Sequence, residues 1–215
     1  ISKKRFKEID LIVSTGRTKK NYKNILQKYF KNFFGSCPNV MIIDHHLAHI
    51  SSSFFSSGLK ESACLSLDAF GDRKSGLIAE ASLKKGIKVI RYLKKDLSLG
   101  NLYSACTEFL GYSDGDEYKV MGLASYGKPT VNFSKIIKFN QKLWQINKKY
   151  FEEQNTPFEH RYSKKFEHDF SKYKRLSNDK ITAKHKDFSA SIQKIISLGM
   201  KKAFLHTKKL SNFKK

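Results

Sequence analysis

The feature that most constrains the fold of this chain is a change in hydrophobic periodicity at Gly58. Before Gly58, short apolar runs of strand length alternate with segments in which apolar residues recur at helical spacing. After it, three successive runs have strand character and are joined by turns. Single strands that alternate with helices are typical of an α/β layer, whereas turn-linked strands form antiparallel sheets. The sequence therefore predicts an α/β fold.

Hydrophobic spacing and turn residues set the expected elements. Before Gly58 they are strands at 8–14 and 40–43 and helices at 19–34 and 45–55. After it they are strands at 63–67, 76–83 and 88–93, helices at 99–110, around 136–146 and at 187–210, and an ordered loop at 112–130. Trp144 is expected to be a core residue on its helix, whereas His160, His168, His185 and His206 are expected to be exposed. Three hairpin-linked strands followed by a helix are typical of the start of a ribonuclease-H-like or actin-like lobe.

The charge balance raises the question of a polyanionic partner. The net charge is +23, but only six of the 42 basic residues are arginines, which leaves 42 − 6 = 36 lysines spread over the chain. Proteins that read bases and phosphates favour arginine, because its planar guanidinium forms paired hydrogen bonds. The composition favours a solvated lysine surface, so a nucleic-acid partner is not expected. Polyanion binding stays open as the alternative.

Cysteine use and hydropathy bear on the compartment. Cys37, Cys64 and Cys106 are isolated in the sequence, which predicts buried thiols in a reducing, cytoplasmic setting. No apolar run reaches about 18 residues, so no membrane partner is expected. The chain starts at Ile1 and ends without a clear closing element, and we expect it to be a piece of a longer protein.

A histidine cluster is the strongest chemical signal. The segment Asp44-His45-His46-Leu47-Ala48-His49 follows an apolar run of strand character. If a helix begins there, His45 and His49 lie on one face and can bind a divalent metal, with Asp68 from the next strand as a third ligand. A structural histidine and a turn-capping aspartate are the alternatives. His46 lies about 100° around the helix, which favours a contact to substrate or to the ligands.

Two further segments could contact a phosphate or another anion. Gly71 would let the backbone approach a phosphate closely. The segment from Asp116 to Gly127 could place Lys119 over an anion, with Gly122 leaving space beside it. A surface ion pair next to a packed turn is the alternative, and the residues alone favour it. No arrangement of a nucleophile with its base is apparent.

Taken together, the motifs resemble those of the NodU/CmcH-type O-carbamoyltransferases, from about Ile9 to Leu210. The resemblance rests on the order and spacing of His45-His46-Leu47-Ala48-His49, Leu67-Asp68-Ala69-Phe70-Gly71-Asp72, Ser98-Leu99-Gly100-Asn101-Leu102-Tyr103-Ser104, Glu117-Tyr118-Lys119-Val120-Met121-Gly122-Leu123-Ala124-Ser125-Tyr126-Gly127 and Asp187-Phe188-Ser189-Ala190-Ser191-Ile192-Gln193. Each motif alone is modest, but the combination is specific. Ser125 stands where relatives usually have proline.

The resemblance implies a fold and a reaction. The fold is a two-lobed actin-like (ASKHA, ribonuclease-H-like) domain, related to the tRNA threonylcarbamoyl-transfer subunit and incomplete at both ends. Residues 1–60 would form the C-terminal part of the first lobe, and residues 61–215 the N-terminal part of the second. A YrdC-like domain of the full-length chain would make carbamoyl-adenylate from carbamoyl phosphate and ATP. The actin-like domain would then transfer the carbamoyl group to a hydroxyl of a small acceptor, such as a sugar or natural product.

The resemblance also implies roles for individual residues. The family's metal ligands correspond to His45, His49 and Asp68, with Fe²⁺ the expected ion and Mn²⁺ or Zn²⁺ as alternatives; a further aspartate ligand would lie beyond Lys215. Gly71, Lys119 and Gly122 are the candidate contacts to ATP or carbamoyl-adenylate, and His46 is the candidate base. This piece is not expected to catalyse the reaction unaided. A hydrogenase-maturation carbamoyl-transfer protein and a non-catalytic, lysine-rich remnant that binds polyanions are the alternatives.

Overall fold

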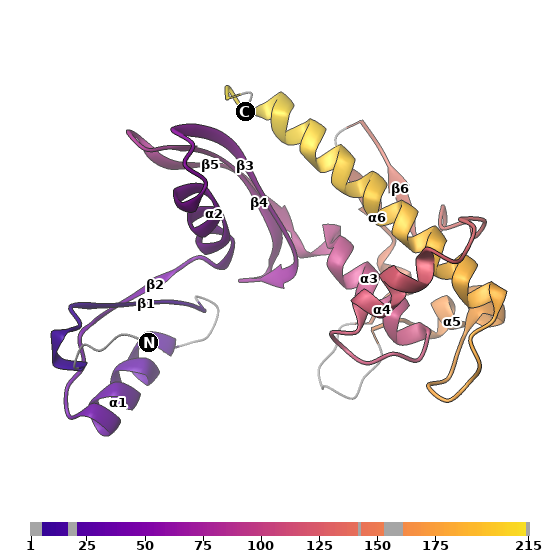
Figure 1. The fold of residues 1–215 in the computed structure, drawn as a ribbon, viewed down its shortest axis with the longest axis horizontal. Coiled ribbons are helices and arrows are strands. Elements are labelled where there is room, and N and C mark those ends of the chain that lie inside the picture. The colour runs from indigo at the N-terminus through magenta and orange to yellow at the C-terminus, as the bar shows by residue number, and fades with distance from the viewer. Residues whose placement is uncertain (1–5, 17–20, 142, 153–160, 214–215) are drawn as a thin grey trace.

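The computed structural model describes residues 6–16, 21–141, 143–152 and 161–213. Along the chain, a strand–helix–strand unit is followed by an antiparallel sheet and then by a mainly helical part (Figure 1). The strands are β1 (Leu11–Thr15), β2 (Asn39–Ile43), β3 (Glu61–Gly71), β4 (Lys74–Ser82), β5 (Gly86–Lys94), β6 (Ile137–Phe139) and β7 (Trp144–Ile146). The α-helices are α1 (Tyr22–Phe34), α2 (His45–Ser56), α3 (Leu99–Phe109), α4 (Glu117–Ala124), α5 (Lys164–Phe170) and α6 (Ala183–Leu210). Short 3₁₀ turns lie at η1 (Phe6–Glu8), η2 (Lys95–Leu97), η3 (Lys148–Tyr150) and η4 (Ser171–Tyr173).

The first unit confirms the predicted strand–helix–strand pattern. β1 and β2 pair in parallel, from Leu11 opposite Asn39 to Thr15 opposite Ile43. The intervening α1 ends at Gly35, whose φ of 71° lies in the left-handed region that glycine adopts without steric cost. β1 begins three residues later than predicted, at Leu11. This unit brings the chain to the start of α2, because β2 ends one residue before the helix cap.

The sheet of β3, β4 and β5 confirms the three predicted hairpin-linked strands, each longer than expected. β4 lies in the middle and is buried on both faces. Leu77 and Ala79 pack with Ile50 of α2, whereas Ile78 belongs to the main core with Leu102 of α3. Helix α2 therefore covers one face of the sheet (Figure 1), so the boundary predicted at residue 60 separates two elements that pack together.

An aromatic cluster forms the main core of the helical part. Phe109 of α3, Phe166 of α5 and Phe188 of α6 are fully buried, and the ring of Phe109 contacts the rings of the other two. Trp144 is buried in the same core, and its indole N–H donates to the carbonyl of Leu97 at 2.8 Å. The described helices include none that is both apolar and long enough to cross a membrane.

Three predictions for this part were wrong. The expected helix around 136–146 is an antiparallel hairpin, β6 and β7, because the apolar residues on each side of its turn alternate with polar ones. Trp144 is therefore a core residue on a strand. The expected loop at 112–130 contains α4. His185 is buried, not exposed, because its Nδ1 accepts the backbone N–H of Thr182 at the start of α6. His160 lies outside the described residues.

The contact between η3 and α5 gives a prediction about pH. The Tyr150 hydroxyl donates to the carboxylate of Asp169 at 2.7 Å, and this bond, with His168, lowers the pKa of Asp169 from 3.8 to about 2. Ionised Asp169 therefore stabilises the fold above pH 3.8, and this contribution is lost as the pH falls towards 2. Asp169→Asn should lower the free energy of unfolding near neutral pH, and the difference from wild type should shrink on acidification. Urea unfolding from about pH 6 to about pH 3 checks this; a constant difference would contradict it.

Candidate metal centre

The site begins with the cap of α2. Asp44 directly follows β2, and its carboxylate accepts the backbone N–H groups of His46 and Leu47, both at 3.1 Å. Lys74 of β4 donates to the other carboxylate oxygen at 2.7 Å. Burial raises the pKa of Asp44, but the hydrogen bonds from Lys74 and Leu47 outweigh burial and hold the pKa below its usual value. The first turn of α2 is thereby fixed against the sheet.

The turn between β3 and β4 contacts the same end of the helix. Asp72 and Arg73 form a two-residue hairpin loop, and both have positive φ, 49° and 63°. Two left-handed residues are the signature of a type I′ turn, which matches the twist of the flanking strands. The carboxylate of Asp72 accepts the backbone N–H of His45 at 2.9 Å. The turn is thus joined to the first residue of α2.

The end of β3 is irregular where Asp68 lies. Leu67 pairs with Gly76 and Gly71 pairs with Lys74, so residues 68–70 face only Ser75 on β4. Bulges of this kind occur next to functional sites, because they change the direction in which a side chain points. Oδ1 of Asp68 accepts the backbone N–H of Ala69 at 2.6 Å, which leaves Oδ2 facing the helix.

Three side chains converge between α2 and β3. Nε2 of His45 lies 2.8 Å from Oδ2 of Asp68 and 3.0 Å from Nε2 of His49, and the third separation, His49 to Asp68, is 3.5 Å. Within the described residues these are the groups whose arrangement could hold a metal ion. Burial raises the pKa of Asp68, but hydrogen bonds from His45 and from the backbone of Ala69 outweigh it, so the carboxylate is ionised at a lower pH than usual.

The geometry fits a divalent metal. Ligand atoms about 2.1 Å from an ion lie about 3.0 Å apart at a right angle and about 3.4 Å apart in a tetrahedron, and the three separations span this range. Two Nε2 atoms 3.0 Å apart cannot both direct lone pairs at each other unless a proton or a cation lies between them. Two imidazoles and one carboxylate on one side are a ligand set for Fe²⁺, Mn²⁺ or Zn²⁺ with open positions.

Helix α3 supports the aspartate from the other side. Ser98, its cap, donates to the backbone carbonyl of Ala69 and accepts the N–H of Asn101 at 3.0 Å. A side chain at Gly100 would lie 2.6 Å from the Cα of Ala69, so the first turn of α3 packs directly on the strand. The contacts that Ser98 and Asp72 make with this site have no signature in the sequence, whereas Asp44 is recognisable as a capping residue before a helix.

Residues 5–207 match the model of a protein family described as the N-terminus of carbamoyltransferases. The chain belongs to this carbamoyltransferase family. Nodulation protein NolNO of Sinorhizobium fredii is 34% identical over 157 residues, which cover 73% of this chain and 22% of that protein. Nodulation protein NolO of Bradyrhizobium diazoefficiens is 39% identical over 87 residues, or 40% of this chain and 16% of that protein.

A third relative covers more of the chain. The uncharacterized protein MJ1058 of Methanocaldococcus jannaschii is 30% identical over 193 residues, which cover 80% of this chain and 28% of that protein. The carbamoyltransferase-family chain therefore spans at most 28% of the length of these three relatives. Its match with the family model includes all three converging side chains, because they lie between residues 45 and 68.

His46 is the predicted base, and its surroundings in the structure are those of a structural histidine. It is fully buried, its Nε2 faces the backbone carbonyl of Lys74 at 3.1 Å, and its Nδ1 lies 3.1 Å from the hydroxyl of Ser66. A carbonyl only accepts, so Nε2 carries the proton and Nδ1 accepts from Ser66. With both ring nitrogens occupied, His46 joins α2 to the sheet, and the catalytic role expected for it does not fit this geometry.

The three predicted nucleotide contacts lie in two places. Gly71 lies next to His45, and a Cβ there would collide with the imidazole ring, so the glycine makes room for this candidate ligand. Lys119 and Gly122 lie on α4, which packs on α6 and α3. Lys119 pairs with Asp116 at 2.9 Å, and this hydrogen bond raises its pKa. The structure does not bring these two residues together with the histidines.

Gly71 gives a testable prediction. Gly71→Ala should displace the ring of His45, weaken metal binding and lower the free energy of unfolding by about 1–3 kcal/mol, since overpacking has costs of this size. Gly122→Ala is the matched control, because a Cβ there meets open space and alanine favours a helix. Urea unfolding and Mn²⁺ titration measure both effects. Equal behaviour of the two variants would show that His45 does not need the space at Gly71.

Proposed function

We propose that this chain is the metal-binding part of an O-carbamoyltransferase, which transfers a carbamoyl group from carbamoyl-adenylate to a hydroxyl of a small acceptor. The observation that carries the proposal is the convergence of His45, His49 and Asp68 in a chain whose residues 5–207 match the carbamoyltransferase N-terminus family. This combination also favours carbamoyl transfer over a lysine-rich remnant that binds polyanions.

The proposed fold is an actin-like, two-lobed domain. Residues 1–60 would belong to the first lobe and residues 61–215 to the second. The strand–helix–strand unit followed by an antiparallel three-stranded sheet and a helix supports this assignment. Because α2 leaves β2 and packs on β3 and β4, its histidines would lie where the two lobes meet.

The proposed resident ion is Fe²⁺, with Mn²⁺ or Zn²⁺ as alternatives. A divalent ion bound there would supply a Lewis acid that polarises phosphate or carbonyl oxygens. The chain itself holds the ligands in place: Asp72 fixes the backbone of His45, and Ser98 fixes the end of β3. The side chain of His49 is about half exposed, at 54%, so the ligand set is open to a substrate on that side.

The proposed reaction is a simple displacement. The acceptor oxygen attacks the carbamoyl carbon, the bond from that carbon to the phosphate oxygen breaks, AMP leaves and the acceptor proton is released. A YrdC-like domain in the longer protein would supply carbamoyl-adenylate from ATP and carbamoyl phosphate. Neither a membrane nor a nucleic-acid partner is proposed. A cytoplasmic location is supported by the free thiols of Cys37, Cys64 and Cys106.

The proposal is tested by the binding of Mn²⁺ and AMP, the leaving group of the reaction. Mn²⁺ should bind the chain, and AMP should change the electron paramagnetic resonance spectrum of the bound ion. Asp68→Asn should abolish both effects. No Mn²⁺ binding, or AMP binding that is independent of the ion, would contradict the proposal. Salt-dependent retention on RNA that is unaffected by His45→Ala would favour polyanion binding instead.

A further inference from the structure

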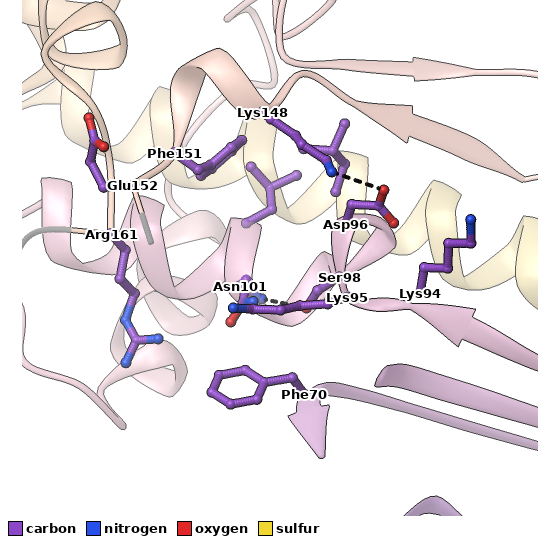
Figure 2. A pocket seen from close by; sticks show the side chains of 12 residues that line it. Phe70, Lys94, Lys95, Asp96, Ser98, Asn101, Lys148, Phe151, Glu152 and Arg161 are labelled. Atoms are coloured by element: carbon purple, nitrogen blue, oxygen red, sulfur yellow. Dashed lines mark hydrogen bonds and ion pairs between the residues drawn. The ribbon is translucent and has the colours of Figure 1, made fainter. Parts of the chain in front are cut away.

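A cavity of about 460 Å³ lies next to the metal centre, between the end of β3, the start of α3 and the η3 region. This volume is within the range of small-molecule sites. Figure 2 shows the side chains around it. The lining residues are Phe70, Lys94, Lys95, Asp96, Ser98, Asn101, Leu102, Ile146, Lys148, Phe151, Glu152 and Arg161.

The cavity and the metal centre share structural elements. Phe70 lies two residues after Asp68 on β3 and borders the cavity. Ser98 also lines it and donates to the backbone carbonyl of Ala69, between these two residues. A molecule bound in the cavity would therefore lie beside the strand end that carries a proposed metal ligand.

The cationic groups of the cavity differ in their pairing. Lys148 pairs with Asp96 at 3.3 Å, and Arg161 pairs with Asp114 at 2.7 Å. Lys94 and Lys95, by contrast, form no ion pair within the described part of the chain. Of the two, Lys95 lies over the aromatic ring of Phe70, and its Nζ is 5.5 Å from the ring centre. In Figure 2 its side chain extends alongside Asn101, above Phe70. An unpaired ammonium beside an aromatic ring favours a ligand that carries a negative charge.

Asn101 presents an unused acceptor. Its Oδ1 is buried and has no hydrogen-bond partner among the residues that the structure describes. A buried polar atom without a partner is unfavourable, so this oxygen favours a ligand with an O–H or N–H donor. Phe70, Leu102 and Phe151 add apolar surface around it.

We infer that this cavity binds the acceptor, and that the acceptor is a small hydroxylated molecule with a negatively charged group. The charge pairs with Lys95, a hydroxyl donates to Asn101, and the body of the molecule packs on Phe70. This inference rests on the proposed carbamoyl transfer, since it assigns the hydroxyl substrate to a place beside the metal centre. A sugar phosphate and a uronic acid share the required chemistry.

The test is a titration of the chain with glucose 6-phosphate, glucuronic acid and uncharged methyl glucoside, followed by calorimetry and by NMR shifts of the Asn101 side-chain amide. The charged sugars should bind at least about tenfold more tightly than the neutral one, because a charge-assisted hydrogen bond is worth this much. Lys95→Glu should weaken the charged sugars by a similar factor, and Asn101→Leu should weaken them too. Lys85→Glu is the control for net charge, since Lys85 is exposed in the β4–β5 turn and does not line the cavity.

Equal binding of charged and neutral sugars would overturn the inference. It would also be overturned if AMP shifted the Asn101 amide signal and displaced the sugars, because the cavity would then be a nucleotide site. The same samples are titrated with Mn²⁺ to separate the two proposals. Mn²⁺ binding with no sugar binding would refute the acceptor site alone. Sugar binding with no Mn²⁺ binding would refute metal-assisted carbamoyl transfer and leave only an anion site.

Discussion

His49→Ala should lower the affinity of the chain for Mn²⁺ by at least about a hundredfold, since even residues that only orient metal ligands are worth 10- to 100-fold. Nε2 of His49 lies 3.0 Å from Nε2 of His45 and 3.5 Å from Oδ2 of Asp68, so its loss removes one of three converging donors. The side chain is about half exposed and leaves no large cavity. The fold should therefore survive, and electron paramagnetic resonance of Mn²⁺ measures the affinity directly.

His168→Ala is the control for this variant. His168 is a histidine on a helix, its side chain is 87% exposed, and it contacts Asp169 instead of a second histidine. It should bind Mn²⁺ as the wild type does, and unfolding in urea should show that His49→Ala is folded. If both variants lose the same affinity, Mn²⁺ binds to histidines in general and the site at α2 does not hold it.

The three converging side chains could be predicted from the sequence because most of the pattern is local. His45 and His49 are one helical turn apart, and the strand before them and the capping residue Asp44 both mark the start of the helix. The position of Asp68 at the end of a predicted strand makes it the candidate third ligand, with turn capping as the alternative. The contacts that orient these side chains could not be predicted in this way, because Asp72 and Ser98 reach them only through the hairpin turn and the docking of α3.

The predictions that the structure contradicts concern segments in which hydrophobic spacing was the main signal or in which a partner residue was not visible. The segment of β6 and β7 was predicted as a helix because the spacing of its apolar residues across the hairpin turn is compatible with one helical face. These residues are Ile137, Phe139, Trp144 and Ile146. Periodicity alone does not separate a short hairpin from a helix in such a segment. The sequence predicts an exposed His185 because it does not show that the ring accepts the backbone N–H of Thr182 at the start of α6.

Phe109→Ala should lower the free energy of unfolding by about 3–5 kcal/mol, the range for deleting a buried phenylalanine side chain. Phe109 is fully buried, and its ring centre lies 5.0 Å from that of Phe166, 5.2 Å from that of Tyr162 and 5.6 Å from that of Phe188. One side chain therefore joins α3 to α5, to α6 and to the segment before α5. Urea unfolding measures the loss.

Phe204→Ala is the matched control, since Phe204 lies on α6 and is 61% exposed, so its removal should change stability by no more than about 1 kcal/mol.

The same two variants also test whether the core around Phe109 affects the candidate metal centre. Phe109 ends the helix that Ser98 begins, so a core that holds α3 rigidly also holds the end of β3. Folded Phe109→Ala protein should then bind Mn²⁺ more weakly, whereas Phe204→Ala should not. Unchanged Mn²⁺ affinity in folded Phe109→Ala would show that β3 and α2 set the ligand geometry without α3.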